Sequence, residues 1–237
     1  MPVQRSRHHA RSKVTPLVDT AWVAEHIDDP QVRIIDARPT PQYVTGHIRD
    51  AVSASFKPSD YASYGVDTSY GGGCDLFTDP QASIPWQDGP KEMLEEVLGT
   101  LGISNDIVVV AVGQGPGFQA TRFFWTLDYC GHRDICVLDG GMQKWLAEGR
   151  SVTKRIPRIA PARYHIGAFD SSKIVHTNFV LENLTDPEVA LVECLPSTWY
   201  SGEYLAYSRR GHLPGAKSFP YAYCFAEDGT WKPAADL

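Results

Sequence analysis

The chain contains two copies of one sequence pattern, and this internal repeat limits the folds open to it more than any other feature. Residues 17–36 align without a gap on residues 174–193, at a constant spacing of 157 residues (Leu17 to Ile174). Each copy predicts a short helix capped by Thr20 or Thr177, a stop at Asp-Pro, and a buried strand at Val32–Ile35 or Val189–Val192. The identical pairs are Val18/Val175, Thr20/Thr177, Val23/Val180, Glu25/Glu182, Asp29/Asp186, Pro30/Pro187 and Val32/Val189.

A second match extends the repeat. The segment Gly46–Ala51 (GHIRDA) corresponds to Gly211–Ala216 (GHLPGA), 165 residues later. Solenoid repeats are about 20–45 residues long, so this longer period predicts a duplicated α/β domain instead. Residues 151–172 combine prolines with basic residues, a composition typical of a linker. We therefore expect a first domain at 14–150, a linker at 151–172 and the first part of a second domain at 173–237.

The stretch from Asp106 to Trp145 predicts a strand–loop–helix–strand unit of a parallel sheet. Its first strand is an uninterrupted apolar run, typical of a strand buried on both faces. In α/β sheets, ligands bind where such a strand ends and its loop opens into a helix. The loop Gly113–Gln119 is therefore a candidate site, although it contains no Cys, Ser, His, Asp, Glu or Lys. The expected elements are strands at Ile107–Val112 and Ile135–Leu138, a helix at Ala120–Tyr129 and a short helix through Trp145.

The second copy stops before its own version of this unit. By the spacing of the repeat, Leu237 corresponds to about residue 72 of the first copy. A half-domain of this kind leaves a sheet edge and apolar surface uncovered. We expect a longer natural chain, or a second half that is poorly ordered or covered by a partner. Cooperative melting of residues 173–237 as a monomer would contradict this expectation.

Composition narrows the class of function. A formal net charge of −6 argues against a nucleic-acid partner, and no apolar run approaches the roughly 18 residues of a membrane span. The five cysteines are odd in number and lack a C-x2-C spacing, so we expect no metal site and a reduced, intracellular protein. The first thirteen residues are basic, lack acids and have few apolar residues, which favours a solvated tail over a transit peptide. We expect a cytoplasmic location, with a mitochondrial one as the alternative.

Taken in order, these motifs resemble the two-domain rhodanese family of thiosulfate and 3-mercaptopyruvate sulfurtransferases. The resemblance covers most of the chain, from about Val14 onward. It implies an α/β fold with two rhodanese-like domains, each a mainly parallel sheet flanked by helices, the second truncated here. The motifs that carry it are Asp36-Ala37-Arg38, Gly46-His47-Ile48, Ala120-Thr121-Arg122, Gly131-His132, Leu138-Asp139-Gly140-Gly141 with Trp145, Gly211–Ala216 and Glu227-Asp228-Gly229.

The resemblance implies sulfur transfer without a cofactor. In the family, one cysteine takes sulfur from a small anionic donor as a persulfide and passes it to cyanide or a thiol acceptor. That cysteine follows the buried strand of the second domain, and its pKa must be lowered so that it is a thiolate. In the first copy the matching residue is Val112, so this copy takes the non-catalytic role. The catalytic cysteine is expected beyond Leu237, and no catalytic residue is assigned within the chain.

The resemblance also implies a pair of arginines that grip the anionic donor, and here the chain departs from the family. The corresponding positions are Leu195 and Trp199, neither of which pairs with an anion. We therefore assign substrate binding to Arg209 and Arg210, against the alternative that two adjacent arginines are simply solvated.

Several polar residues of the repeat have both a structural and a functional interpretation. Arg122 either assists an anion bound by the Gly113–Gly117 loop or pairs with a local carboxylate, and we favour the second. We expect Asp36 and Arg38 to fix a strand-end loop. The histidines His47 and His212 are interpreted as turn residues bonded to backbone.

The cysteines are interpreted as structural. We expect Cys130 to close a helix, Cys136 to fill a core position on a strand and Cys194 to fill a small buried position at a strand end. Cys224 is placed in a core or loop segment, and Cys74 in an exposed insertion. None lies at a strand–loop–helix junction that would lower its pKa.

Two further functions are alternatives to sulfur transfer. A non-catalytic rhodanese-like module for protein interaction or regulation is the main alternative, favoured by Leu195 and Trp199. A cysteine phosphatase requires a cysteine about six residues before an arginine at a helix start, and the Val112–Arg122 stretch supplies neither. The sulfur donor, the acceptor and the oligomeric state stay open at this point.

Overall fold

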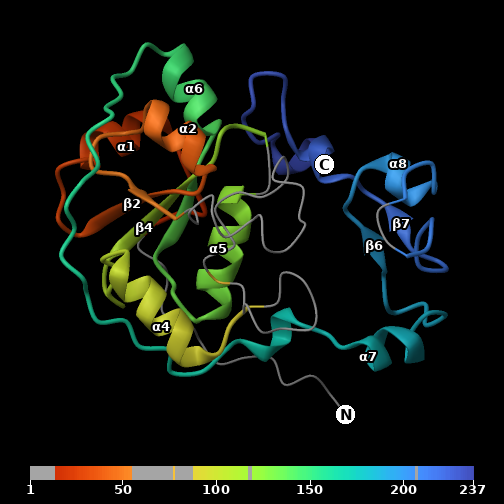
Figure 1. The fold of residues 1–237 in the computed structure, drawn as a ribbon. Helices are drawn as coiled ribbons and strands as arrows, with labels where there is room; N and C mark the ends of the chain where they lie inside the picture. Colours follow the sequence, from red (N-terminus) through yellow and green to blue (C-terminus); the bar gives the residue numbers. More distant parts are fainter. Residues whose placement is uncertain (1–13, 55–76, 78–87, 117–118, 206–207) are drawn as a thin grey trace.

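A five-stranded parallel sheet forms the centre of the molecule. The computed structural model describes residues 14–54, 77, 88–116, 119–205 and 208–237. The strand order is β1-β5-β4-β2-β3, and every neighbouring pair is parallel (Figure 1). This confirms the α/β fold class. The strands are Leu17–Val18 (β1), Val32–Asp36 (β2), Val52–Ser53 (β3), Val108–Val112 (β4) and Ile135–Leu138 (β5).

Helices cover both faces of this sheet, which explains the continuous apolar sequence of β4. Val109 and Ala111 of β4 belong to one core cluster, together with buried side chains of α4 (Lys91–Thr100) and α5 (Gln119–Tyr129). Val108, Val110 and Val112 belong to the other, with side chains of α1 (Thr20–His26) and α6 (Gly141–Ala147). Because successive strand residues face opposite sides, a strand between two helical layers has to be apolar throughout.

The element boundaries agree with the sequence to within one residue in the Asp106–Trp145 stretch. Strand β5 has the expected bounds, β4 begins one residue later than expected, and α5 begins one residue earlier. The capping residues differ. Asp19 caps α1, because its Oδ1 accepts a hydrogen bond from the Trp22 N–H at 2.7 Å. Thr20 is the first helical residue, and its hydroxyl donates to the carboxylate of Glu148, the C-cap residue of α6, instead.

Most of the predicted linker, residues 151–172, is packed along the first unit, residues 14–150 (Figure 1). Thr153 pairs with His47 in an antiparallel bridge. The side chains of Tyr164 and Ile166 are buried in the core cluster shared with α4 and α5. Asn105 and His165 exchange hydrogen bonds of 2.8 and 3.0 Å. The chain therefore leaves the first unit only near Asp170, where η2 (Ser171–Lys173) begins.

Residues 173–237, the second unit, carry several details of the first at the spacings of the repeat. Ile35 pairs with Val52 in the first unit, and Val192 pairs with Lys217 in the second. The Tyr43 ring stacks on His47 at 3.9 Å, and the Tyr200 ring stacks on His212 at 3.6 Å. The elements of the second unit are α7 (Thr177–Glu182), β6 (Val192–Glu193), α8 (Ser197–Tyr200), β7 (Lys217–Ser218), η3 (Tyr221–Cys224) and η4 (Ala234–Asp236). The counterpart of α8 in the first unit is α2 (Thr40–Thr45).

The second unit buries far less apolar surface than the first. Neither α7 nor α8 contains a buried residue, and Val192 of β6 is 52% exposed. The prediction of a buried strand at Val189–Val192 is therefore wrong. The physical reason is that β6 pairs with β7 alone in a two-stranded sheet, whereas β2 lies inside a five-stranded sheet between two helical layers. Thr177 is not a helix cap either, because His176 occupies the N-cap position of α7.

Candidate functional site

The carboxyl end of β4 is where an α/β sheet of this kind places its chemistry, and Val112 is the last residue of that strand. Its side chain is fully buried in the core cluster that contains Met142 and Trp145. An aliphatic side chain in this place offers neither a nucleophile nor a proton-transfer group. Among the residues that the structure describes, the first unit therefore has no reactive group at the end of its central strand.

Neighbouring residues occupy most of the space beside the loop that follows β4. The N–H groups of Met142 and Gln143, at the start of α6, donate to the carbonyl oxygens of Gly113 and Gln114 at 2.9 and 2.7 Å. The cavity beside the loop has a volume of only about 10 Å³, room for roughly one water molecule. Its lining combines the two units: Gly113, Gly115, Ala120, Thr121, Val137, Leu138, Gly140 and Gly141 from the first, and Phe225, Gly229 and Trp231 from the second. Residues 117 and 118 of the predicted anion-binding loop lie outside the described residues.

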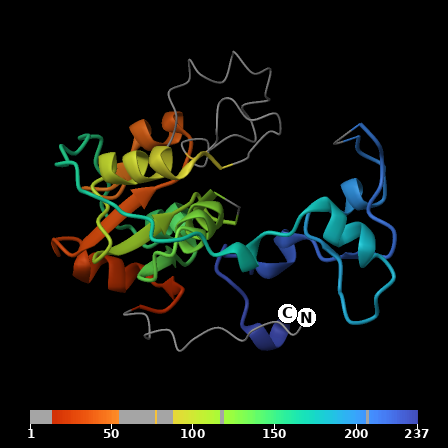
Figure 2. The same ribbon diagram turned by 90° about the horizontal axis from the view of Figure 1, so that it is seen from below.

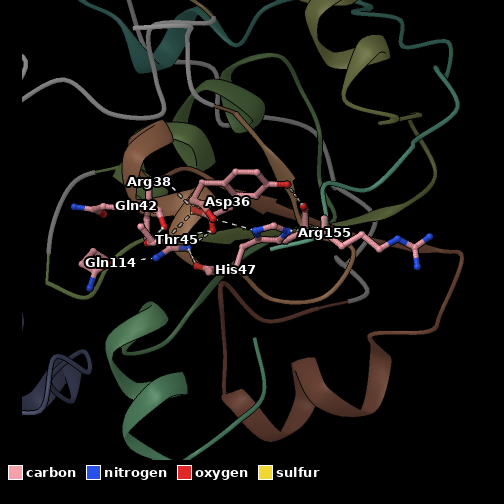
Figure 3. Close-up of polar contacts among 10 residues, drawn as sticks. Asp36, Arg38, Gln42, Thr45, His47, Gln114 and Arg155 are labelled. Carbon is pink, nitrogen blue, oxygen red and sulfur yellow. Dashed lines mark hydrogen bonds and ion pairs between the residues drawn. The ribbon is translucent and has the colours of Figure 1, made fainter. Parts of the chain in front are cut away.

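Asp36 and Arg38 form a buried ion pair at the end of β2 (Figure 3). The Arg38 guanidinium donates through Nε to Asp36 Oδ1 at 2.9 Å and through Nη2 to Oδ2 at 2.6 Å. Nη2 also donates to the Gly46 carbonyl at 2.8 Å, and Nη1 to Gln114 Oε1 at 3.4 Å. The pair thus connects the end of β2, the end of α2 and the loop after β4. This confirms that Asp36 and Arg38 fix a strand-end loop.

Both motif histidines are bound to backbone, as expected. His47 is fully buried, and its Nδ1 and Nε2 lie 3.0 and 3.1 Å from the carbonyl oxygens of Tyr43 and Arg155. His212 Nδ1 lies 2.8 Å from the Tyr200 carbonyl oxygen. Because both ring nitrogens of His47 face acceptors, this side chain is not placed to act as a general base.

Arg122, at the start of α5, pairs with a local carboxylate. Its Nη2 lies 2.6 Å from Asp88 Oδ1, and its guanidinium carbon lies 4.8 Å from the centre of the Trp125 ring. Burial raises the pKa of Asp88, and the Arg122 charge offsets part of this rise. The structure therefore confirms the carboxylate pairing for Arg122.

The assigned substrate arginines lie in an exposed loop before Gly211. Both arginines are exposed, and Arg210 donates through Nη1 to the carbonyl oxygens of Gly202 and Glu203, at 2.9 and 2.7 Å. Of the two residues that replace the family's arginine pair, Trp199 stacks on Tyr204 at 5.3 Å. Within the described residues, no group of three or more His, Cys, Asp or Glu side chains is arranged to hold a metal ion. The described helices include none long and apolar enough to cross a membrane.

The cysteines divide into buried and accessible groups. Cys136 is buried as predicted, and Cys130, which directly follows α5, is buried as well. Burial raises the pKa of each thiol to about 12, with the Asp88 charge contributing at Cys130. The prediction of a buried Cys194 is wrong: it is exposed, directly after β6, which pairs only with β7 among the strands of the described residues. Cys224 is partly exposed, and Cys74 lies outside the described residues.

We expect iodoacetamide at pH 8 to modify Cys194 at least about 100-fold faster than Cys136. A thiol with a pKa of about 12 is ionised to only about one part in ten thousand at that pH, and only the thiolate reacts. Labelling followed by peptide mass spectrometry measures both rates in one sample. In concentrated urea the two rates should converge, and equal rates in the native protein would contradict the assignment.

The second unit contacts the loop after β4, which the sequence did not predict. The backbone N–H of Trp231 donates to Asp139 Oδ1 at 2.9 Å. A Cβ atom added at Gly229 would lie 2.9 Å from Pro116 Cδ. The only sequence signal was the turn motif Glu227-Asp228-Gly229 between two aromatic residues. A local turn signal does not tell which distant surface the turn contacts.

Comparisons with known proteins agree with this architecture. A family model described as rhodanese-like domain matches residues 19–148. The chain is 33% identical over 233 residues to the sulfur carrier protein TtuD of Thermus thermophilus, covering 93% of this chain and 75% of TtuD. It is 25% identical over 211 residues to a thiosulfate sulfurtransferase of Azotobacter vinelandii, covering 86% of this chain and 69% of the relative.

Solved structures show the same fold. The crystal structure of SseA from Escherichia coli, described as a 3-mercaptopyruvate sulfotransferase with the rhodanese fold, superposes with a TM-score of 0.78 at 24% identity, covering 94% of this chain and 81% of SseA. The parallel sheet, the motif positions and the family match over more than half of the sequence lead to one conclusion. The chain belongs to the rhodanese family.

Proposed function

We propose that the protein is a rhodanese-type sulfurtransferase, which moves sulfane sulfur from thiosulfate or 3-mercaptopyruvate to cyanide or another thiophilic acceptor through a cysteine persulfide. The names of its relatives support sulfur transfer as the general activity. In the proposed reaction with thiosulfate, a cysteine thiolate attacks the outer sulfur, the S–S bond breaks and sulfite leaves. Cyanide then attacks the outer sulfur of the persulfide, giving thiocyanate and restoring the thiolate.

Val112 is the observation that supports a non-catalytic first unit and a catalytic second domain. The first unit has a buried aliphatic residue at the end of β4, where a persulfide cysteine would stand. We assign it the non-catalytic role and place the persulfide cysteine in the second domain, at the counterpart of Val112, beyond Leu237.

Substrate binding is assigned to the basic pair Arg209 and Arg210. Both residues are exposed, and two backbone carbonyls hold the Arg210 guanidinium in place. Two positive charges in one loop attract a small dianion such as thiosulfate. Their contribution is therefore to draw the donor toward the second unit.

The direct test is thiocyanate production from thiosulfate and cyanide. Residues 1–237 should give a rate close to the uncatalysed background, because Cys130 and Cys136 have raised pKa values and Val112 is inert. A chain extended by the coding sequence that follows Leu237 should be active, and a Cys→Ser change at the counterpart of Val112 should abolish its activity. Robust activity of residues 1–237 that a Cys194→Ser change removes would overturn the proposal.

A non-catalytic interaction or regulatory module is the second candidate. It is favoured by Leu195 and Trp199 at the positions of the family's arginine pair and by the exposed apolar side chains of the second unit, such as Leu181 and Leu213. The two functions differ in one outcome of the same assay. An extended chain that contains a cysteine after its apolar strand but transfers no sulfur from either donor would favour the interaction module.

A further inference from the structure

The segment Phe225–Trp231 is a tight hairpin whose conformation is fixed by its own residues. Phe225 and Trp231 form an antiparallel bridge, and their rings lie 4.6 Å apart. The Gly229 N–H donates to the Ala226 carbonyl at 3.0 Å, and Gly229 has a φ of +84°, a conformation that favours glycine. Asp228 Oδ1 accepts from the N–H and the hydroxyl of Thr230 at 3.0 and 2.6 Å. Such a hairpin is preorganised, so docking it onto another surface costs little conformational entropy.

This hairpin docks on the first unit at the loop after β4. Asp139, directly after β5, accepts the Trp231 N–H at 2.9 Å. Gly229 is buried against Pro116, where a methyl group would come within 2.9 Å of Cδ. Charges also match: hydrogen bonds from Thr230 lower the pKa of Asp228, and the positive charge of Lys144 in α6 lowers it further. In Figure 1 the dark blue C-terminal segment lies beside the loop between β4 and α5.

The second unit is thus held to the first at two separate places. At its start, Lys173 Nζ lies 2.5 Å from Asp128 Oδ2. Just before it, the Asp170 N–H donates to the Tyr129 carbonyl at 2.9 Å, so both contacts lie at the C-terminal end of α5. Near its other end, the hairpin contacts the opposite, N-terminal end of α5 through the loop. Two anchors at the two ends of one helix fix the orientation of the intervening chain. Figure 2 shows the second unit lying to one side of the first.

We propose that Asp139 and the Gly113–Pro116 loop form a latch for the Phe225–Trp231 hairpin, and that Asp139 is a positioning residue that orients the second unit for sulfur transfer. The loop at the end of β4 serves as an internal docking site in place of a ligand site. The contacts described above support the latch itself. Its role in sulfur transfer depends on the proposed function. The carboxylate matters as a hydrogen-bond acceptor, so asparagine, which keeps Oδ1, can replace it, whereas leucine cannot.

The latch is tested in residues 1–237 by amide hydrogen exchange followed by NMR. In Asp139→Leu the Trp231 amide should exchange at least tenfold faster than in the unchanged chain, while the amides of β4 keep their protection and report an intact fold. Asp139→Asn should stay within twofold of the unchanged chain. Glu227→Gln, a change on the exposed side of the same hairpin, is the matched control and should have no effect. Unchanged Trp231 protection in Asp139→Leu would overturn the latch.

The positioning role is tested in the chain extended past Leu237. Asp139→Leu should lower kcat/KM for thiosulfate at least fivefold, with Asp139→Asn restoring it. Loss of Trp231 protection without any change in kcat/KM would leave the latch but overturn the positioning role. If no extended variant transfers sulfur, the proposed function fails, and the exchange measurement still decides the latch.

Discussion

Replacing Arg38 by methionine is expected to lower the free energy of unfolding by about 3–5 kcal/mol, because it leaves the Asp36 carboxylate buried without its partner. The side chains of Arg38 and Asp36 are only 4% and 1% exposed, so water cannot take over the lost hydrogen bonds. The Gly46 carbonyl would lose a donor as well. Urea denaturation of the single variant, monitored by tryptophan fluorescence, measures the loss.

The chain offers a matched control with the same pair of residue types. Arg49 and Asp28 are 2.7 Å apart, but their side chains are 49% and 77% exposed. Arg49→Met should therefore cost far less stability than Arg38→Met, because water and salt screen an exposed pair. The double variant Asp36→Leu/Arg38→Met should recover much of the Arg38→Met loss, since no unpaired charge remains. Equal losses at the buried and the exposed pair would refute this account of the buried pair.

The sequence correctly predicted those elements whose residue pattern depends on their immediate surroundings. Ile135–Leu138 and most of Ile107–Val112 are continuous apolar runs, and only a strand between two covered faces needs such a run. The backbone-bound state of His47 followed from its place in a turn motif. The pairing of Arg122 with a carboxylate was predicted, but its partner Asp88 was not, because 34 residues separate the two.

The failures have a common cause in contacts that are distant in sequence. Val189–Val192 has the pattern of a buried strand, yet burial depends on the layers that cover it, and Val192 lies in a two-stranded sheet. Thr20 has a typical capping residue type, but Asp19 takes the cap, and Thr20 bonds to Glu148 across the fold. The role of Val112 came from the family resemblance; residue chemistry alone shows only that an aliphatic side chain is inert.

The Leu138–Gly141 motif shows how local and distant constraints meet in one turn. Asp139 accepts the Trp231 N–H, and the next two glycines have φ values of +74° and +54°. Gly141 lets the first turn of α6 approach the loop after β4: a methyl group there would lie 2.6 Å from the Gly113 carbonyl oxygen and 3.0 Å from the Gly115 nitrogen. Both obstacles are backbone atoms, which cannot rotate out of the way.

Gly141→Ala is therefore expected to lower the free energy of unfolding by about 2–5 kcal/mol, combining about 1–2 kcal/mol of left-handed backbone strain with about 1–3 kcal/mol of overpacking. The loop would have to move away from α6, which weakens the hydrogen bond from the Met142 N–H to the Gly113 carbonyl. Faster exchange of the Met142 amide should accompany the loss of stability measured in urea.

Gly149→Ala separates the two contributions. Gly149 has a φ of +70° at the end of the same helix, but a methyl group there meets no atom within 4 Å. It should cost only the backbone strain, about 1–2 kcal/mol. The difference between the two variants then measures the close approach of α6 to the loop. If both variants lower the free energy of unfolding equally, the loop accommodates a methyl group without cost. Close packing against α6 then does not hold the loop in place.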